Sequence, residues 1–96
     1  MDLFELRNSQ LKDLRTYLLK NLSIINQEYN IKISDNIATM SQDQFVAWLK
    51  VYSSKILLNK DAKNCKDLKE KVAEFLSIET EVEIKDNELT MSKTLF

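Results

Sequence analysis

The sequence predicts an α+β, predominantly helical fold, with three main helices, a short strand and a C-terminal β-hairpin in a single domain over residues 1–96. Three observations support this fold class. Apolar residues recur at spacings of three and four over most of the chain, which is typical of helices with one buried face. The period changes to two in the last twenty residues, as in half-buried strands. The chain has no glycine and no proline, so few positions require unusual backbone angles and long helices are favoured.

The first helix is expected over residues 2–28, with Asn30 ending it because asparagine tolerates the left-handed conformation. At 1.5 Å per residue this helix would be about 40 Å long, whereas a compact domain of this size is roughly 26 Å across. We therefore expect the helix to break or one end to project. Residues 31–33 alternate Ile-Lys-Ile and predict a very short strand. The apolar residues of the first helix share one face: Leu11, Leu14, Leu18, Leu22, Ile25 and Tyr29.

The second helix is expected over residues 41–58 and the third over residues 64–77. Ser41 and Gln44 form a capping-box pattern, and Asn64 is the predicted cap of the third helix. Trp48 lies on an apolar helical face, so core packing is favoured over an aromatic binding platform. The inward residues predicted for the two helices are Phe45, Trp48, Leu49, Tyr52 and Ile56, and then Cys65, Leu68, Val72, Phe75 and Leu76.

The hairpin is expected over residues 78–95, with Asp86-Asn87 as a two-residue turn because both types accept positive φ. Folding the chain there pairs Val82 with Met91 on one side of the ribbon, apolar residue facing apolar residue. The resulting order is helix, short strand, helix, helix and hairpin. That order resembles the winged-helix arrangement, which implies a helix-turn-helix followed by a β-hairpin wing.

Composition excludes several kinds of site. The absence of glycine excludes phosphate-binding glycine loops, and the absence of histidine excludes Ser–His or Cys–His nucleophile pairs. The single cysteine, Cys65, excludes a thiolate metal cage and an internal disulfide, and we expect it to be buried. We therefore expect no catalytic activity, no cofactor, no metal and no small-molecule substrate.

The net charge of −1 gives no general attraction to nucleic acid or to an anionic membrane. No apolar run is long enough to span a bilayer, and the N-terminal residues Asp2 and Glu5 are unlike the basic start of a secretory signal. We expect an intracellular protein, cytoplasmic or nuclear.

Charge is nevertheless unevenly placed. Residues 50–71 hold seven lysines and three acids, and residues 72–96 hold two lysines and six acids. On a winged-helix fold the lysine-rich stretch would contact phosphates, but an acidic wing tip and intrahelical Lys–acid pairs weigh against DNA, and a solvated surface is the favoured reading. The DNA-contacting candidates in this alternative are Lys60, Lys63, Lys66 and Lys69.

On the hairpin, Glu79, Glu81 and Glu83 would form an acidic stripe on the outer side of the ribbon. Such a stripe suits a small inhibitor that occupies a basic site on its target. A charged strand that simply prevents edge-to-edge pairing is the simpler interpretation.

A seven-residue apolar repeat in the first helix is the most specific interaction signal. It predicts a helix face that binds another protein or a second copy of the chain, unless the same face covers the domain's own core. The sequence thus favours a non-catalytic interaction or regulatory module, with a DNA-binding regulator and an acidic-hairpin inhibitor as alternatives. The candidate interface residues of the repeat are Phe4, Leu11, Leu18 and Ile25.

Overall fold

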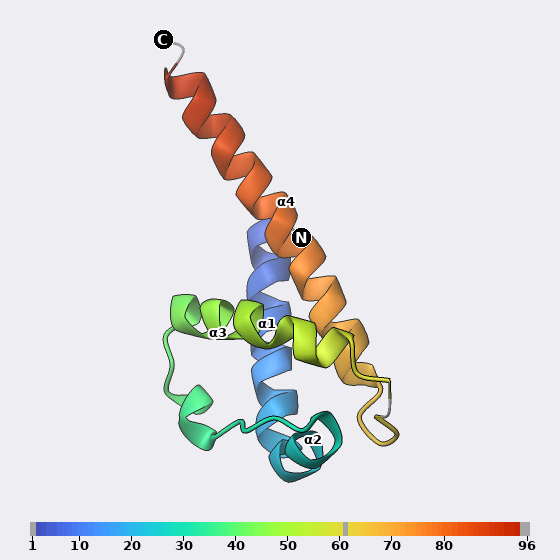
Figure 1. Cartoon of the computed structure of the whole chain (residues 1–96). Coiled ribbons are helices and arrows are strands. Elements are labelled where there is room, and N and C mark those ends of the chain that lie inside the picture. The colour runs from blue at the N-terminus through green and yellow to red at the C-terminus, as the bar shows by residue number, and fades with distance from the viewer. Residues whose placement is uncertain (1, 61, 95–96) are drawn as a thin grey trace.

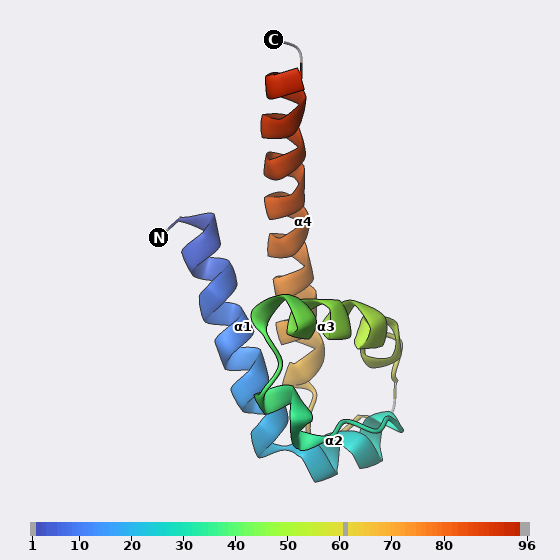
Figure 2. The same ribbon diagram turned by 90° about the vertical axis from the view of Figure 1, so that its left-hand side faces the viewer.

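The computed structural model describes residues 2–60 and 62–94, and for residues 87–94 it describes the backbone alone. Helices α1 and α4 lie side by side and run in opposite directions, while α3 crosses them and α2 closes the end of the body opposite the chain termini (Figures 1 and 2). The helices in order are α1 (Leu3–Lys20), α2 (Leu22–Tyr29), the 3₁₀ helix η1 (Asp35–Ala38), α3 (Gln42–Leu57) and α4 (Asp67–Thr94).

Helix α1 ends at Lys20, so the helix predicted over 2–28 breaks at Asn21, one of the two outcomes that its length required. The Asn21 side chain donates from Nδ2 to the carbonyl oxygen of Tyr17 at 2.8 Å, which satisfies a carbonyl in the last turn of α1. Asn30 ends α2 with φ 53° and ψ 49°, which confirms the predicted left-handed terminator. The break turns α2 across the end of the body (Figure 2).

The short strand predicted over residues 31–33 is wrong, because this segment pairs with a side chain and not with another strand. Ile33 donates its N–H to Asn26 Oδ1 at 2.7 Å, and Asn26 Nδ2 donates to the Ile33 carbonyl at 2.9 Å. One asparagine amide thus supplies both hydrogen bonds that a neighbouring strand would supply. The alternation of buried and exposed side chains is confirmed, since Ile31 and Ile33 are buried and Lys32 is exposed.

Helix α3 begins where the sequence indicated. Ser41 Oγ accepts from the Gln44 N–H at 3.2 Å, and Gln44 Oε1 accepts from the Ser41 N–H at 3.0 Å, which confirms the capping box. The next helix begins at Asp67 rather than at the predicted Asn64. The sequence-predicted core is present around α3 and the first half of α4, where the buried side chains are Phe45, Leu49, Ile56, Cys65, Leu68, Val72 and Phe75.

The C-terminal β-hairpin predicted over residues 78–95 is wrong, because α4 continues as one helix of 28 residues to Thr94. The described part of the chain contains no strand and is 79% helical by residue count, so the α+β class and the winged-helix resemblance are wrong with it. The Val82–Met91 pairing cannot form within this helix, and the Met91 side chain lies outside the described residues.

A helical period lies within the same residues that suggested strands. Phe75, Ile78 and Val82 are spaced by three and four, and Val82 is buried while Ile78 is half-buried. The segment is rich in glutamate and lysine, which favour helix over strand. A two-residue turn at Asp86-Asn87 would need positive φ at two non-glycine residues, and an isolated two-stranded hairpin is only marginally stable. Continuation of the helix along α1 avoids both costs.

The continuous helix gives the molecule an elongated shape, with principal extents of 52 × 28 × 24 Å. Its radius of gyration is 15.1 Å, compared with about 12.5 Å for a compact domain of this length. The difference comes from the C-terminal part of α4, which projects beyond the N-terminal end of α1 (Figure 2). The end that projects is therefore on the last helix and not on the first.

Candidate functional site

The seven-residue repeat of α1 and α2 lies mostly in the core. Leu18 and Ile25 are fully buried and Leu11 is 3% exposed, whereas Phe4 is 53% exposed. In this arrangement three of the four predicted interface residues are out of reach of a partner. Their burial favours the alternative interpretation, in which the repeat covers the domain's own core.

The lysine-rich stretch forms the connection from α3 to α4. Lys60, Lys63 and Lys66 are exposed and Lys69 is half-buried on the first turn of α4. Contact with nucleic acid remains a prediction for this surface, but the winged-helix scaffold on which that prediction depended is absent from the described residues.

The α3–α4 connection is held in place by one carboxylate from α2. Glu28 accepts the backbone N–H groups of Lys63, Asn64 and Cys65 at 3.3, 2.8 and 3.1 Å. These hydrogen bonds, of which the one from Asn64 is the largest contribution, lower the pKa of the Glu28 carboxyl from its ordinary 4.5. The exposed lysines are thus carried on an anchored backbone.

The three glutamates of the predicted acidic stripe do not share a surface. Glu79 is buried and forms an ion pair with Arg7 of α1. Glu83 pairs with Lys50 of α3 at 2.5 Å, and Glu81 is exposed. Because successive helical residues are rotated by about 100°, positions two apart point to opposite sides, so the stripe existed only on the hairpin.

The most distinctive surface is the outer side of α3. The opposite side of this helix is firmly packed, since Phe45, Leu49 and Ile56 are fully buried. Yet Val51 is 72% exposed and Leu58 is 76% exposed, the largest values among the exposed large hydrophobic side chains that the structure describes. Two large apolar side chains therefore face solvent one heptad apart, Val51 within α3 and Leu58 at its C-cap.

Aromatic side chains extend this apolar surface toward the core. The Trp48 and Tyr52 rings lie 4.8 Å apart between centroids, and Trp48 stacks on Phe45 at 5.9 Å. Trp48 and Tyr52 are half-buried, so part of each side chain is accessible at the surface. Lys55 Nζ lies 5.9 Å from the Tyr52 ring centroid. We call the surface made by Trp48, Val51, Tyr52, Lys55 and Leu58 the α3 face.

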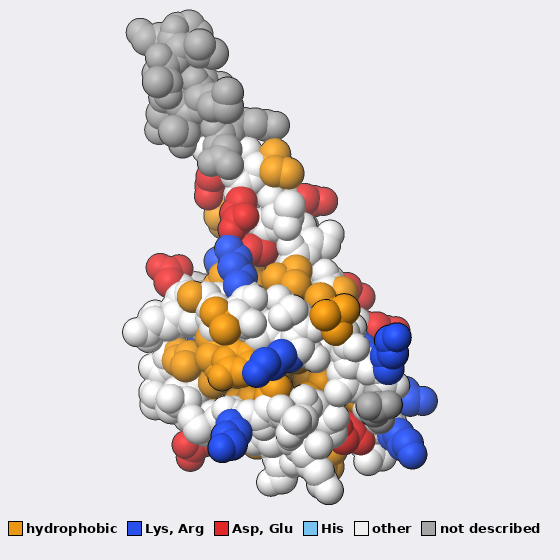
Figure 3. Space-filling model, in the orientation of Figure 1, with side chains coloured by type: hydrophobic (Ala, Val, Ile, Leu, Met, Phe, Trp, Pro, Cys, Tyr) orange, Lys and Arg blue, Asp and Glu red, His pale blue; other side chains and the backbone are white. Residues whose placement is uncertain are grey.

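Figure 3 shows hydrophobic side chains gathered into a band over this side of the body, with cationic side chains (Lys or Arg) on it and beside it. Residues 44–60 contain Lys50, Lys55 and Lys60 and no aspartate or glutamate. The α3 face is therefore both apolar and cationic. Such a combination suits a partner surface that is apolar and acidic.

Below α3, a buried cluster joins three elements around Cys65. Tyr29 Oη donates to the Cys65 carbonyl oxygen at 2.7 Å, and burial raises the pKa of the Cys65 thiol. Burial, followed by the nearby Cys65, raises the pKa of Tyr17 to about 12. A protonated, buried thiol is a poor nucleophile, so these groups stabilise the packing of α1, α2 and the start of α4.

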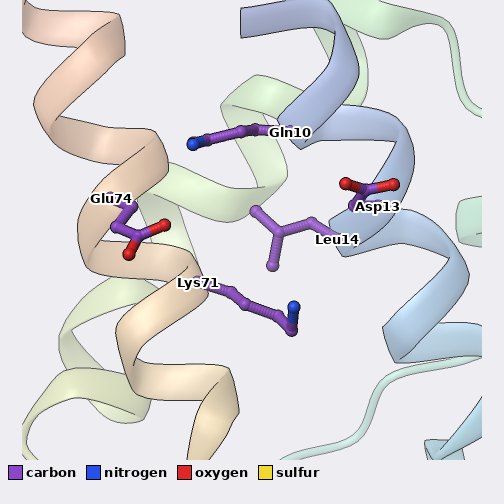
Figure 4. Close-up of a pocket in the computed structure, with 5 residues that line it drawn as sticks. All are labelled: Gln10, Asp13, Leu14, Lys71 and Glu74. Carbon is purple, nitrogen blue, oxygen red and sulfur yellow. The ribbon is translucent and has the colours of Figure 1, made fainter. Parts of the chain in front are cut away.

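A small pocket lies between α1 and α4 and is lined by polar and charged groups (Figure 4). Its volume is about 100 Å³, whereas ligand pockets in proteins are typically about 300–1,000 Å³. Gln10 Oε1 is buried in this region and has no hydrogen-bond partner among the described residues. The pocket is lined by Gln10, Asp13, Leu14, Lys71 and Glu74.

The described residues contain no metal-binding cluster and no membrane-spanning helix. No group of three or more Cys, Asp or Glu side chains there is arranged to hold a metal ion. None of the described helices combines the length and the apolar character needed to cross a bilayer.

The sequence predicted Trp48 in the core and left Val51 outside the inward set, without a role for it. A signal was present, because Val51 and Leu58 fall outside the inward set of Phe45, Leu49 and Ile56 and are one heptad apart. No protein-family model, curated protein or solved structure matches the chain.

Proposed function

We propose that this protein is a non-catalytic interaction module that binds a protein partner through the α3 face. The observation that carries the proposal is the exposure of Val51 and Leu58 on a helix whose other side is fully buried. Covering one such side chain contributes roughly 1.5–3 kcal/mol. Two of them, beside the half-buried side chains of Trp48 and Tyr52, provide the apolar centre that protein interfaces require.

The geometry of the face favours a helical partner. Val51 and Leu58 are separated by about 10 Å along the helix axis at 1.5 Å per residue. An amphipathic helix laid across this distance presents apolar side chains at matching spacings of three, four and seven. Lys55 within the face and Lys60 beyond its C-terminal end favour acidic residues at the edges of that partner helix.

Site-specific photocrosslinking in the native cell tests the proposal. A photoreactive residue is placed singly at Val51, at Leu58 and, as a matched control, at Ile24, which is 42% exposed on α2 and lies outside the α3 face. We expect discrete adducts with a defined protein from positions 51 and 58 and none from position 24.

A second experiment checks that the adduct depends on the apolar surface. Val51→Glu in the chain that carries the crosslinker at Leu58 should abolish the adduct, whereas Ile24→Glu should leave it intact. Equal labelling from all three positions, or an adduct that persists with Val51→Glu, would overturn the proposal.

A further inference from the structure

The projecting part of α4 is an exposed helix that emerges from an otherwise packed body (Figures 1 and 2). Val82 is the last described side chain of α4 that is buried, and Ile84 is already 51% exposed. The helix continues to Thr94, so residues 84–94 span about 16 Å at 1.5 Å per residue. We call residues 81–94 the α4 arm.

The base of the arm is acidic and apolar. Glu81 is exposed and has no ion-pair partner among the described residues, and Ile84 follows it by three residues on the adjoining part of the helix surface. Glu79 and Glu83, in contrast, are already paired with Arg7 and Lys50. The arm thus offers a carboxylate to the cationic part of the α3 face and an exposed apolar side chain to its apolar part.

Pairing between these two helices already occurs within one chain. Lys50 of α3 donates to Glu83 Oε1 of α4 at 2.5 Å. Lys55 follows Lys50 by five residues along α3 and lies over Tyr52 in the middle of the α3 face. Its carboxylate counterpart is not supplied by the described residues of its own chain.

From this complementarity we infer that the chain associates with itself, the α4 arm of one copy docking on the α3 face of a second copy. This inference rests on the proposed function, because it names the partner of the α3 face. In the pair, Ile84 of the arm covers Val51, and Glu81 approaches Lys55. With these two contacts the arm runs antiparallel to α3, and its remaining residues continue past Val51 toward Trp48.

The exchange is reciprocal. Each copy carries one arm and one face, so two copies related by a two-fold axis satisfy both sets of contacts and leave no arm unpaired. A closed pair also avoids the open chain of copies that a one-way contact would create. The expected assembly is a dimer.

Sedimentation equilibrium of the full chain at low and high salt tests this inference through a charge exchange. Lys55→Glu and Glu81→Lys each place like charges together and should weaken dimerisation at least about fivefold, and the double variant should recover most of the loss. Higher salt should weaken the wild-type dimer, because the ion pair lies at a solvent-exposed edge. Lys32→Glu, an exposed lysine between α2 and η1, is the matched control and should not change the dissociation constant.

Three results would overturn the inference. These are a wild-type chain that remains monomeric, a dimer that neither single charge reversal weakens, and a double variant no tighter than the single ones. Photocrosslinking separates this failure from failure of the proposed function. Adducts from Val51 with a different protein, on a monomeric chain, would retain the α3 face as a binding site and reject the second copy as its occupant.

Discussion

Arg7 on α1 and Glu79 on α4 form an ion pair that is largely withdrawn from water, with side-chain exposures of 14% and 9%. A second hydrogen bond joins Arg7 Nη2 to Glu79 Oε1 at 3.4 Å. The pair fixes the antiparallel register of the two longest helices near the point where the α4 arm leaves the body. It also places a glutamate on the inward side of α4, where an apolar residue would otherwise be expected.

Loss of one member of this pair should be strongly destabilising. Arg7→Ala leaves the Glu79 carboxylate buried without its partner, and the free energy of unfolding should fall by about 3 kcal/mol. The double change Arg7→Met with Glu79→Leu should restore most of that loss, because an apolar pair fits the same interface. Urea denaturation followed by circular dichroism measures both, with Lys12→Ala, exposed on the same helix, as the control. A decrease no larger than that of the control would contradict a stabilising role for the pair.

Glu28 should make stability depend on pH in the acid range. Its carboxyl has a pKa below the ordinary 4.5 because backbone N–H groups of the α3–α4 connection hold it ionised. A carboxyl whose pKa is lowered by folding stabilises the fold above its unfolded pKa, and that contribution is lost as pH falls through the folded pKa. Urea midpoints should therefore decrease below pH 4.5, and Glu28→Gln should reduce this decrease. The matched control is Glu70→Gln. If Glu28→Gln changes the acid dependence of stability no more than this control does, the hydrogen bonds to Glu28 do not contribute to it.

Tyr17 should ionise late in alkali. Its pKa is raised to about 12 from 10.0, chiefly by burial, so folding favours the neutral phenol. This contribution is complete below pH 10 and is lost as pH rises toward 12. In a spectrophotometric titration of the folded protein, Tyr17→Phe should remove a late-titrating phenol and leave the early part of the curve unchanged. Loss of an early-titrating phenol in that variant would place Tyr17 at the surface.

Replacement of Gln10 by an apolar residue should not reduce the stability of the fold. Its Oε1 is buried with no hydrogen-bond partner among the described residues, beside the pocket between α1 and α4. Gln10→Met keeps the length of the side chain and removes the buried acceptor, so the free energy of unfolding should stay the same or rise by about 1 kcal/mol. Gln27→Met, at an exposed position of α2, controls for the change in helix propensity. A decrease of more than about 1 kcal/mol relative to that control would mean that Gln10 is hydrogen-bonded in solution.

Local signals in the sequence predicted the local features of the fold. Asn30, Ser41 and Gln44 terminate or begin helices through contacts with their own neighbours, and such contacts can be read from four or five consecutive residues. The inward faces of the helices were predicted for the same reason, because a period of 3.6 is itself a local pattern.

The C-terminal hairpin could not be rejected from local pattern alone. Residues 78–84 fit a period of two as well as spacings of three and four. The choice between them depends on the packing of α4 against α1, which includes the ion pair of Arg7 and Glu79, 72 positions apart in the chain. The degree of exposure on α3 is likewise a tertiary property, so the sequence left Val51 outside the inward set but did not predict that it faces solvent.

If another protein chain covers the α3 face, Trp48 should report on it directly. Trp48 is the only tryptophan, and it is half-buried at the edge of this face. Its emission and its quenching by acrylamide should be measured as the concentration of the full chain rises from about 1 to about 200 μM, the range in which a small interface forms. We expect a blue shift and weaker quenching at high concentration, both absent in the Val51→Glu, Leu58→Glu double variant. Binding at the α3 face would be contradicted if Trp48 emission and quenching stayed constant in the wild-type chain over this range, and also after addition of any protein crosslinked at Val51.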